Sequence, residues 1–225
     1  MCMKYRRSLV LVCISVMMFA LAACGNNSVE DTQKETQSEQ VESEQENTEP
    51  TETETEVKVE FETANDILTM VWEKYEVADT DGNPYNDRFY LMGGHFESAV
   101  MDMPAAYDLT KTEDLELMFC VPADAIPMID EAATMIHLMK ATTFTGGAYH
   151  VADVANLATV VDGMKQQILA NHWLDGFPDM YVIAVVDEQY VVSAIGDSQV
   201  VEHFISSLSE IFGKQVTVQV QENIR

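Results

Sequence analysis

The sequence predicts an α+β fold for residues 58–225, a two-layer sandwich in which an antiparallel sheet carries helices on one face. Two observations support this prediction. From residue 132 onward, runs with strand and helix periodicity follow one another in the order ββ-α-ββ-α-β. The stretch from Lys58 to Arg225 is also long enough to bury a core of its own. Helices that alternate with hairpins in this way are expected to pack on the sheet that the hairpins form.

The first two strands of this order are short and apolar. The runs "AATMIHLM" (132–139) and "GAYHVA" (147–152) predict them, and "KATTFTG" (140–146) is expected to be the loop between them because it is rich in Thr and Gly.

The remaining strands have clearer signals. The runs "YVIAVV" (181–186) and "YVVSAI" (190–195) flank Asp187-Glu188-Gln189 and predict a hairpin of two buried strands. The run "QVTVQV" (215–220) alternates strictly between apolar and polar residues, which predicts a last strand.

Three helices are expected from spacing and caps. Thr63 to Asp66 resembles a capping box, and apolar residues continue from it at helical spacing toward Tyr75. Asp153 precedes a second apolar stripe, which consists of Val154, Leu157, Val161, Met164 and Ile168. Asp197 or Ser198 begins a third helix, and Gly213 ends it.

Residues 88–127 give a weaker pattern. The runs "RFYLM" and "LELMFCV" have the composition of strands, but Pro104, Pro122 and Pro127 interrupt any long element. Cys120 lies in the second of these runs and is expected to be a small buried residue rather than a nucleophile.

The N-terminus has the features of a lipoprotein signal peptide, residues 1–23. Three basic residues among the first seven precede thirteen uncharged, mostly apolar residues, Ser8 to Ala20. Small residues then lead to Cys24, and "LAAC" resembles a bacterial lipobox. That resemblance implies that the Cys24 thiol carries a diacylglycerol and becomes the mature N-terminus, since two acyl chains hold a protein stably on a bilayer.

Residues 24–57 are predicted to be the lipidated cysteine and a disordered acidic linker. Residues 25–57 contain eleven Asp or Glu, one lysine and no aromatic residue. Such a segment buries too little apolar surface to offset its ordering entropy. A flexible chain of 33 residues spans about 30–35 Å, so the linker would hold a single domain, 58–225, near the membrane.

The charge of that domain limits its partners. It contains 27 Asp and Glu against 8 Lys and Arg, a net charge of −19. Nucleic acid is therefore not expected as a partner, and anionic lipid headgroups would be repelled. The simplest explanation of this charge is a soluble domain outside the cell, and a cationic ligand or a weakly bound divalent ion is the alternative.

Two longer strings are similar to those of a known family. The strings "AATMIHLMKATTFTGGAYHV" and "NHWLDGFPDMYVIAVV" resemble an uncharacterised family of small cell-envelope lipoproteins of Firmicutes, mainly Clostridia-type bacteria, with a domain of unknown function. The resemblance spans most of residues 64–212. It implies a lipoprotein in a Gram-positive setting, and no activity or ligand.

The candidate metal ligands are His137 and His150, with Asp153 nearby. Numbers of facing residues in an antiparallel pair sum to a constant, and a sum of 287 places the two histidines side by side, with Cβ atoms about 5 Å apart. A sum shifted by one places them on opposite faces. In the favourable register Asp153 can orient one imidazole. Met135 and Met139 share the face of His137, which favours a packing role instead.

Three other motifs have simpler explanations. The string "AIGDSQV" (194–200) contains the Gly-Asp-Ser of one lipase class, but without that class's Asp-x-x-His pair it is expected to be a helix cap. The string "DTDGNPYND" (79–87) lacks EF-hand spacing and is expected to be a solvated turn, with a different calcium loop as the alternative. The methionines, including Met101 and Met103, are expected to fill the core rather than to bind soft metals.

We therefore expect a non-enzymatic domain on the extracellular face of the cell membrane, anchored through Cys24, that binds an envelope protein or a small ligand without a cofactor. An envelope hydrolase, a metal-dependent enzyme and a structural or assembly lipoprotein are the alternatives. The sequence contains no visible set of nucleophile, base and orienting group, which favours binding over catalysis.

Overall fold

The computed structural model describes residues 58–74, 91–173 and 176–224. The chain divides into Met1–Glu52 and a second unit, Thr53–Arg225, to which all described residues belong. The expected signal peptide, Cys24, the linker and the loop at 79–87 lie outside the described residues.

The second unit is built on one antiparallel sheet. Its strands are β1 (Leu91–Gly93), β2 (Val100–Met101), β3 (Ala105–Ala106), β4 (Ile129–His137), β5 (Phe144–Val151), β6 (Met180–Val186), β7 (Tyr190–Gly196) and β8 (Val216–Asn223). They lie in the order β2-β1-β4-β5-β7-β6-β8, and β3 also pairs with β4. The helices are α1 (Ala64–Lys74), α2 (Thr112–Phe119), α3 (Leu157–Ala170) and α4 (Ser198–Phe212).

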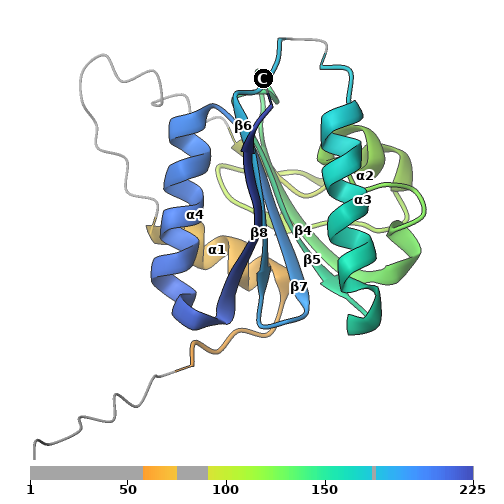
Figure 1. Cartoon of the computed structure of the whole chain (residues 1–225). Helices are drawn as coiled ribbons and strands as arrows, with labels where there is room; N and C mark the ends of the chain where they lie inside the picture. The colour runs from red at the N-terminus through yellow and green to blue at the C-terminus, as the bar shows by residue number, and fades with distance from the viewer. Residues whose placement is uncertain (1–57, 75–90, 174–175, 225) are drawn as a thin grey trace, which may run out of the picture. The chain divides into compact units, whose positions relative to one another are not determined.

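The α+β class, the antiparallel sheet and the order ββ-α-ββ-α-β are confirmed, but the helices cover both faces of the sheet. Helices α1 and α4 lie on one side of it, and α2 and α3 lie on the other (Figure 1). The prediction of a two-layer sandwich with helices on one face is therefore wrong. The physical reason lies in the central strands, because all seven residues of β6 are buried and so both of its faces need cover.

Each face has its own apolar core. On one side Ile67, Leu68, Phe204 and Leu208 of α1 and α4 pack over alternate residues of β6, such as Val182 and Ala184. On the other side α2 and α3 contribute Leu115, Phe119, Met164 and Ile168, which pack with Tyr181, Ile183 and Val185. The alternation of β6 between the two cores follows from the two-residue period of a strand.

The predicted helices form where their caps indicated. The Asp66 N–H donates to Thr63 Oγ1 at 3.1 Å and the Thr63 N–H donates to Asp66 Oδ2 at 2.9 Å, which is the reciprocal capping box. Asp153 caps a short 3-10 turn, Val154–Asn156, that precedes α3. Val154 is consequently exposed and not part of the buried stripe.

The run "LELMFCV" is helical from Leu115 to Phe119, which corrects the expectation of a strand. It forms most of α2, whose first turn contains Glu113 and Asp114, and acidic residues stabilise that end of a helix. Leu115 and Phe119 lie one turn apart and are buried. Cys120 follows with φ of 56°, which ends the helix.

Strands β4 and β5 pair in a different register from the one that favours a metal site. Glu131 faces His150 and Ile136 faces Thr145, so facing numbers sum to 281. Residues 144–146, expected in the loop, belong to β5. A Cβ on Gly147 would lie 2.1 Å from Tyr149 Oη. The buried Tyr149 side chain lies over this position of β5. A glycine, which has no Cβ, leaves room for it.

Candidate functional site

Residues 58–61 contact the β6–β7 hairpin and the segment that leads into β8. Lys58 Nζ lies 2.8 Å from Asp187 Oδ1 in the turn between β6 and β7. The backbone of Val59 makes two hydrogen bonds with the side-chain amide of Gln215. The Phe61 ring contacts Tyr190 edge-on, at a centroid distance of 5.2 Å. Residues 58–61 therefore follow a defined path before α1 begins.

Two neighbouring turns meet this segment. Asp187 and Glu188 both have positive φ, 50° and 61°, in the turn that joins β6 to β7. The Asp187 N–H donates to the Gln215 carbonyl at 2.9 Å. Helix α4 ends at Phe212, and Gly213, with φ of 52°, turns the chain toward β8. Glycine adopts this left-handed conformation without the strain that a side chain would add.

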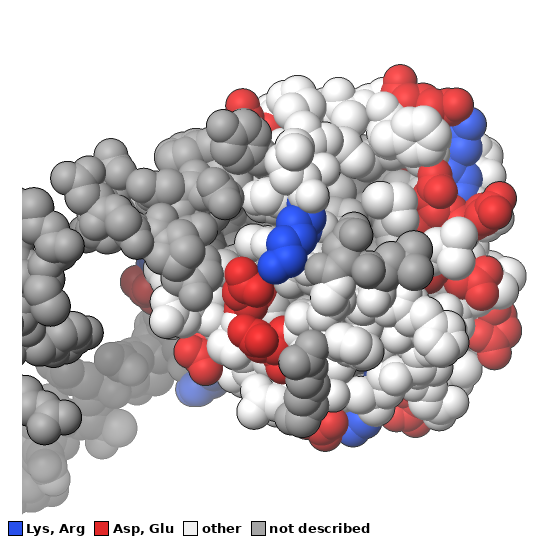
Figure 2. Space-filling model, turned by 90° about the horizontal axis from the view of Figure 1, so that it is seen from above, with Lys and Arg blue, Asp and Glu red and all other residues white. Residues whose placement is uncertain are grey.

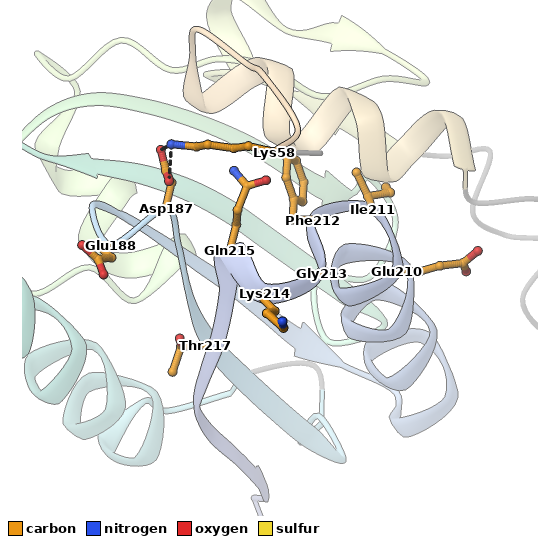
Figure 3. A pocket seen from close by; sticks show the side chains of 10 residues that line it. All are labelled: Lys58, Asp187, Glu188, Glu210, Ile211, Phe212, Gly213, Lys214, Gln215 and Thr217. Carbon is orange, nitrogen blue, oxygen red and sulfur yellow. Dashed lines mark hydrogen bonds and ion pairs between the residues drawn. The ribbon is translucent and has the colours of Figure 1, made fainter. Parts of the chain in front are cut away.

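A pocket of about 480 Å³ lies between these segments. It is lined by Lys58, Asp187, Glu188, Glu210, Ile211, Phe212, Gly213, Lys214, Gln215 and Thr217. In Figure 3 the Lys58 side chain reaches Asp187, and the Gln215 amide points toward the same place. The volume lies within the range of small-molecule sites, about 300–1,000 Å³.

The pocket lining carries charges of both signs. It contains three carboxylates and two ammonium groups. Asp187 is paired with Lys58, and Glu210 is paired with Lys74 of α1. The C-terminus of α4 adds partial negative charge from its last carbonyl groups. The hydrogen bond to Asp187 raises the pKa of Lys58 above its usual value, and the fields of Asp187, Glu60 and Glu188 act in the same direction.

A second depression, of about 510 Å³, lies beside α2 and contains a histidine–aspartate pair. His95 is buried, and its Nε2 lies 2.8 Å from Asp114 Oδ2. Its Nδ1 accepts a hydrogen bond from the Glu97 N–H at 3.3 Å. The ring hydrogen is therefore on Nε2, which donates a hydrogen bond to Asp114. Both ring nitrogens are therefore engaged within the fold, and the imidazole joins α2 to the segment after β1.

Other polar groups beside this depression are also paired with one another within the fold. Lys111 Nζ lies 2.6 Å from Glu97 Oε2 and holds the pKa of Glu97 below its usual value. Tyr107 donates its hydroxyl hydrogen to the Lys111 carbonyl at 3.0 Å. Burial, and next the charge of Asp114, raises the pKa of Tyr107 to about 12, so its phenol stays protonated at neutral pH. No local sequence motif marks His95 or Asp114, which are 19 residues apart.

The candidate histidine pair does not form. Glu131 faces His150, and His137 lies six residues further along β4, about 20 Å away at 3.4 Å per residue. His150 Nδ1 instead lies 2.5 Å from Asp130 Oδ1, at the bulge where the β4–β5 register shifts. Asp153 accepts from the Ala155 N–H and orients neither histidine. The proposed pairing of His137, His150 and Asp153 is therefore wrong.

No group of three His, Cys, Asp or Glu side chains suited to a metal ion occurs among residues 58–74, 91–173 and 176–224. Met101 and Met103 are 50% and 42% exposed, so the expectation that they fill the core is wrong.

Asp197 is the N-cap residue of α4, but its side chain makes no capping hydrogen bond. Burial raises its pKa above the usual range.

Cys120 is buried, as expected. Its Sγ accepts from Asn171 Nδ2 at 3.4 Å. Burial raises the pKa of the thiol to about 12. The thiolate, which is the nucleophilic form, is therefore scarce at neutral pH.

Comparison of the chain with protein-family models, curated proteins and solved structures gives no match. Within the described part of the chain, no helix combines the length and the apolar character that spanning a bilayer requires.

Proposed function

We propose that the chain is a lipoprotein held on the extracellular face of the cell membrane through Cys24, and that its domain binds a small, positively charged ligand. The pocket beside Lys58 supports this proposal best, because it combines a suitable volume with three carboxylates in its lining. It lies where the tether would enter the domain, so the ligand would bind close to the anchoring segment. The proposed lipid anchor agrees with the resemblance to envelope lipoproteins of Firmicutes.

The charge of the whole domain supports a cationic ligand. Acidic side chains outnumber basic ones on the face drawn in Figure 2, in agreement with the composition. Such a surface attracts cations over a distance of about 8 Å at physiological salt. It disfavours nucleic acids and anionic polymers as partners.

Calorimetric titration of the full-length protein in detergent tests the ligand. The probes are cadaverine, spermidine and choline, with glutamate and glucose as the anionic and neutral controls. Glu188→Gln is expected to weaken binding of the cations about five-fold, as the loss of ~1 kcal/mol for an exposed charge pair implies. Glu113→Gln on α2 is the matched control. Equal binding by all five probes, or by none of them, would contradict the proposal.

Lys58→Ala tests the sign of the charge that the pocket prefers. The substitution removes an ammonium group from the pocket and releases Asp187 from its ion pair. Cation binding is then expected to strengthen. Weaker binding would show that Lys58 itself contacts an anionic ligand.

Metabolic labelling tests the anchor. Cells that express the wild-type chain or Cys24→Ala are grown with a clickable fatty acid, and only the wild type is expected to incorporate it. Equal incorporation by the two would refute lipidation at Cys24.

A further inference from the structure

The two edges of the sheet differ in how well they are protected from pairing with another strand. At one edge, β2 has only two residues, and Asp102, with φ of 61°, and Pro104 follow it closely. Short edge strands, charges and prolines are the devices that prevent edge-to-edge association. At the other edge, β8 has eight residues. At about 3.4 Å per residue it offers an edge of about 27 Å.

The outer edge of β8 is open in the part of the chain that the structure describes, where β8 pairs with β6 and with no other strand. In Figure 1 this strand lies at the front, at the edge of the sheet between α4 and α3. Thr217, Val218 and Gln219 are exposed. Val218 is 43% exposed although it is apolar.

The middle of β8 is uncharged although it is exposed. Residues 216–221 contain no charge and no proline, in a domain with a net charge of −19. One protective device is present: the register with β6 shifts at Gln219, which forms a bulge. A bulge increases the local twist of a strand. It therefore opposes the flat stacking of many copies more than the pairing of two.

The charges at the two ends of β8 have opposite signs. Lys214 precedes the strand and Glu222 lies near its end. The Glu222 carboxylate accepts from Lys165 Nζ at 2.9 Å and from Tyr181 Oη at 3.0 Å, which holds it in place. A carboxylate has about four acceptor positions, so it can take a further donor.

We propose that β8 is a dimerisation edge and that its partner is β8 of a second copy of this chain, in antiparallel orientation. A pairing centred on Val218 brings Lys214 of each copy to Glu222 of the other, since both lie four residues from the centre. The two ion pairs are related by a two-fold axis, and such an interface closes after two copies. The uncharged centre is the part of the surface where two acidic domains approach with the least repulsion.

This inference does not rest on the ligand proposed above, although Lys214 and Thr217 also line the pocket. Glu188 lines the pocket and lies outside β8, so Glu188→Gln is expected to leave the oligomeric state unchanged. A change in ligand binding without a change in oligomeric state, or the reverse, distinguishes the two proposals.

Sedimentation velocity of the full-length protein in detergent measures the oligomeric state. The wild type is expected to form dimers. Val218→Lys and Thr217→Glu place like charges across the two-fold axis or close to it, and are expected to raise the dimer dissociation constant at least about ten-fold. Leu117→Lys is the matched control, since Leu117 is also an exposed apolar residue but lies on α2. Circular dichroism verifies that each variant is folded.

Zero-length carbodiimide cross-linking of mixed ¹⁴N- and ¹⁵N-labelled copies identifies the interface. A cross-link between Lys214 of one isotope and Glu222 of the other is expected, and its loss is expected in Val218→Lys. A monomeric wild type would overturn the proposal. The partner of β8 would then be an extended segment of another protein. A dimer that persists in both β8 variants would overturn it as well, because the interface would then lie elsewhere.

Discussion

The side-chain amide of Gln215 pairs with the backbone of Val59 in the manner of a neighbouring strand. The Val59 N–H donates to Gln215 Oε1 at 2.7 Å, and Gln215 Nε2 donates to the Val59 carbonyl at 3.1 Å. The two residues are 156 positions apart. This pair therefore joins the beginning of the domain to the segment that leads into β8.

Gln215→Ala is expected to lower the free energy of unfolding by about 1–2 kcal/mol, because it leaves a half-buried donor and acceptor of Val59 without partners. Urea denaturation measures this change, and hydrogen exchange of the Val59 amide is expected to accelerate. Gln166→Ala, on an exposed residue of α3, is the control. Unchanged exchange at Val59 would contradict the expected role of Gln215.

The capping box of α1 is expected to contribute about 1 kcal/mol. Thr63→Ala and Asp66→Ala each remove one of its two side-chain acceptors, so each is expected to lower the free energy of unfolding by that amount. Urea denaturation of both variants is compared with that of Glu73→Ala, an exposed substitution in the last turn of the same helix. Equal stability of all three would exclude a stabilising cap.

Gly147→Ala is expected to cost about 2–3 kcal/mol, because the new Cβ would collide with the buried Tyr149 side chain. The hydroxyl oxygen is the nearest atom, at 2.1 Å, and ring Cζ follows at 2.5 Å. Adding Tyr149→Phe removes the hydroxyl and is expected to restore part of the loss. Thermal unfolding of the two single variants and the double variant measures this coupling. Strict additivity of the two changes would contradict the proposed collision.

Glu222 makes the stability of the domain depend on pH in the acidic range. The Lys165 ammonium, and next the Tyr181 hydroxyl, hold the pKa of Glu222 below its ordinary value of 4.5. Because the folded-state pKa is the lower one, this contribution is complete above pH 4.5 and is lost as the pH falls through the folded-state value.

Glu222→Gln is therefore expected to show a smaller fall in melting temperature than the wild type between neutral pH and about pH 3. Glu113→Gln, an exposed substitution on α2, is expected to behave as the wild type does. Parallel curves for the wild type and Glu222→Gln would show that the ion pair adds nothing to stability.

The separation of His137 and His150 predicts that they do not share a metal ion. Calorimetric titration with zinc is expected to give the same result for the wild type, His137→Ala and His150→Ala. Loss of one tight site in both variants would contradict the register of β4 and β5.

The amino-acid sequence predicted the elements whose signals are local. The hairpin of β6 and β7 followed from two apolar runs around a short turn, and the ends of α1 and α4 followed from Thr63–Asp66 and from Gly213. These signals depend on residues within one turn or one hairpin, so they are legible in a single chain. The prediction of a strand in the region of α2 is wrong, because "LELMFCV" is short enough to fit either a strand or two helical turns.

Tertiary packing determined the layers, the register and the pocket. The sheet needs helices on both faces because β6 is buried on both, and no local pattern says which face a given helix covers. The β4–β5 register joins residues from two different strands, and it separates His137 from His150. The pocket combines Lys58, Asp187 and Lys214, which only the folded chain brings together, since contacts between distant segments depend on the shape of the whole core.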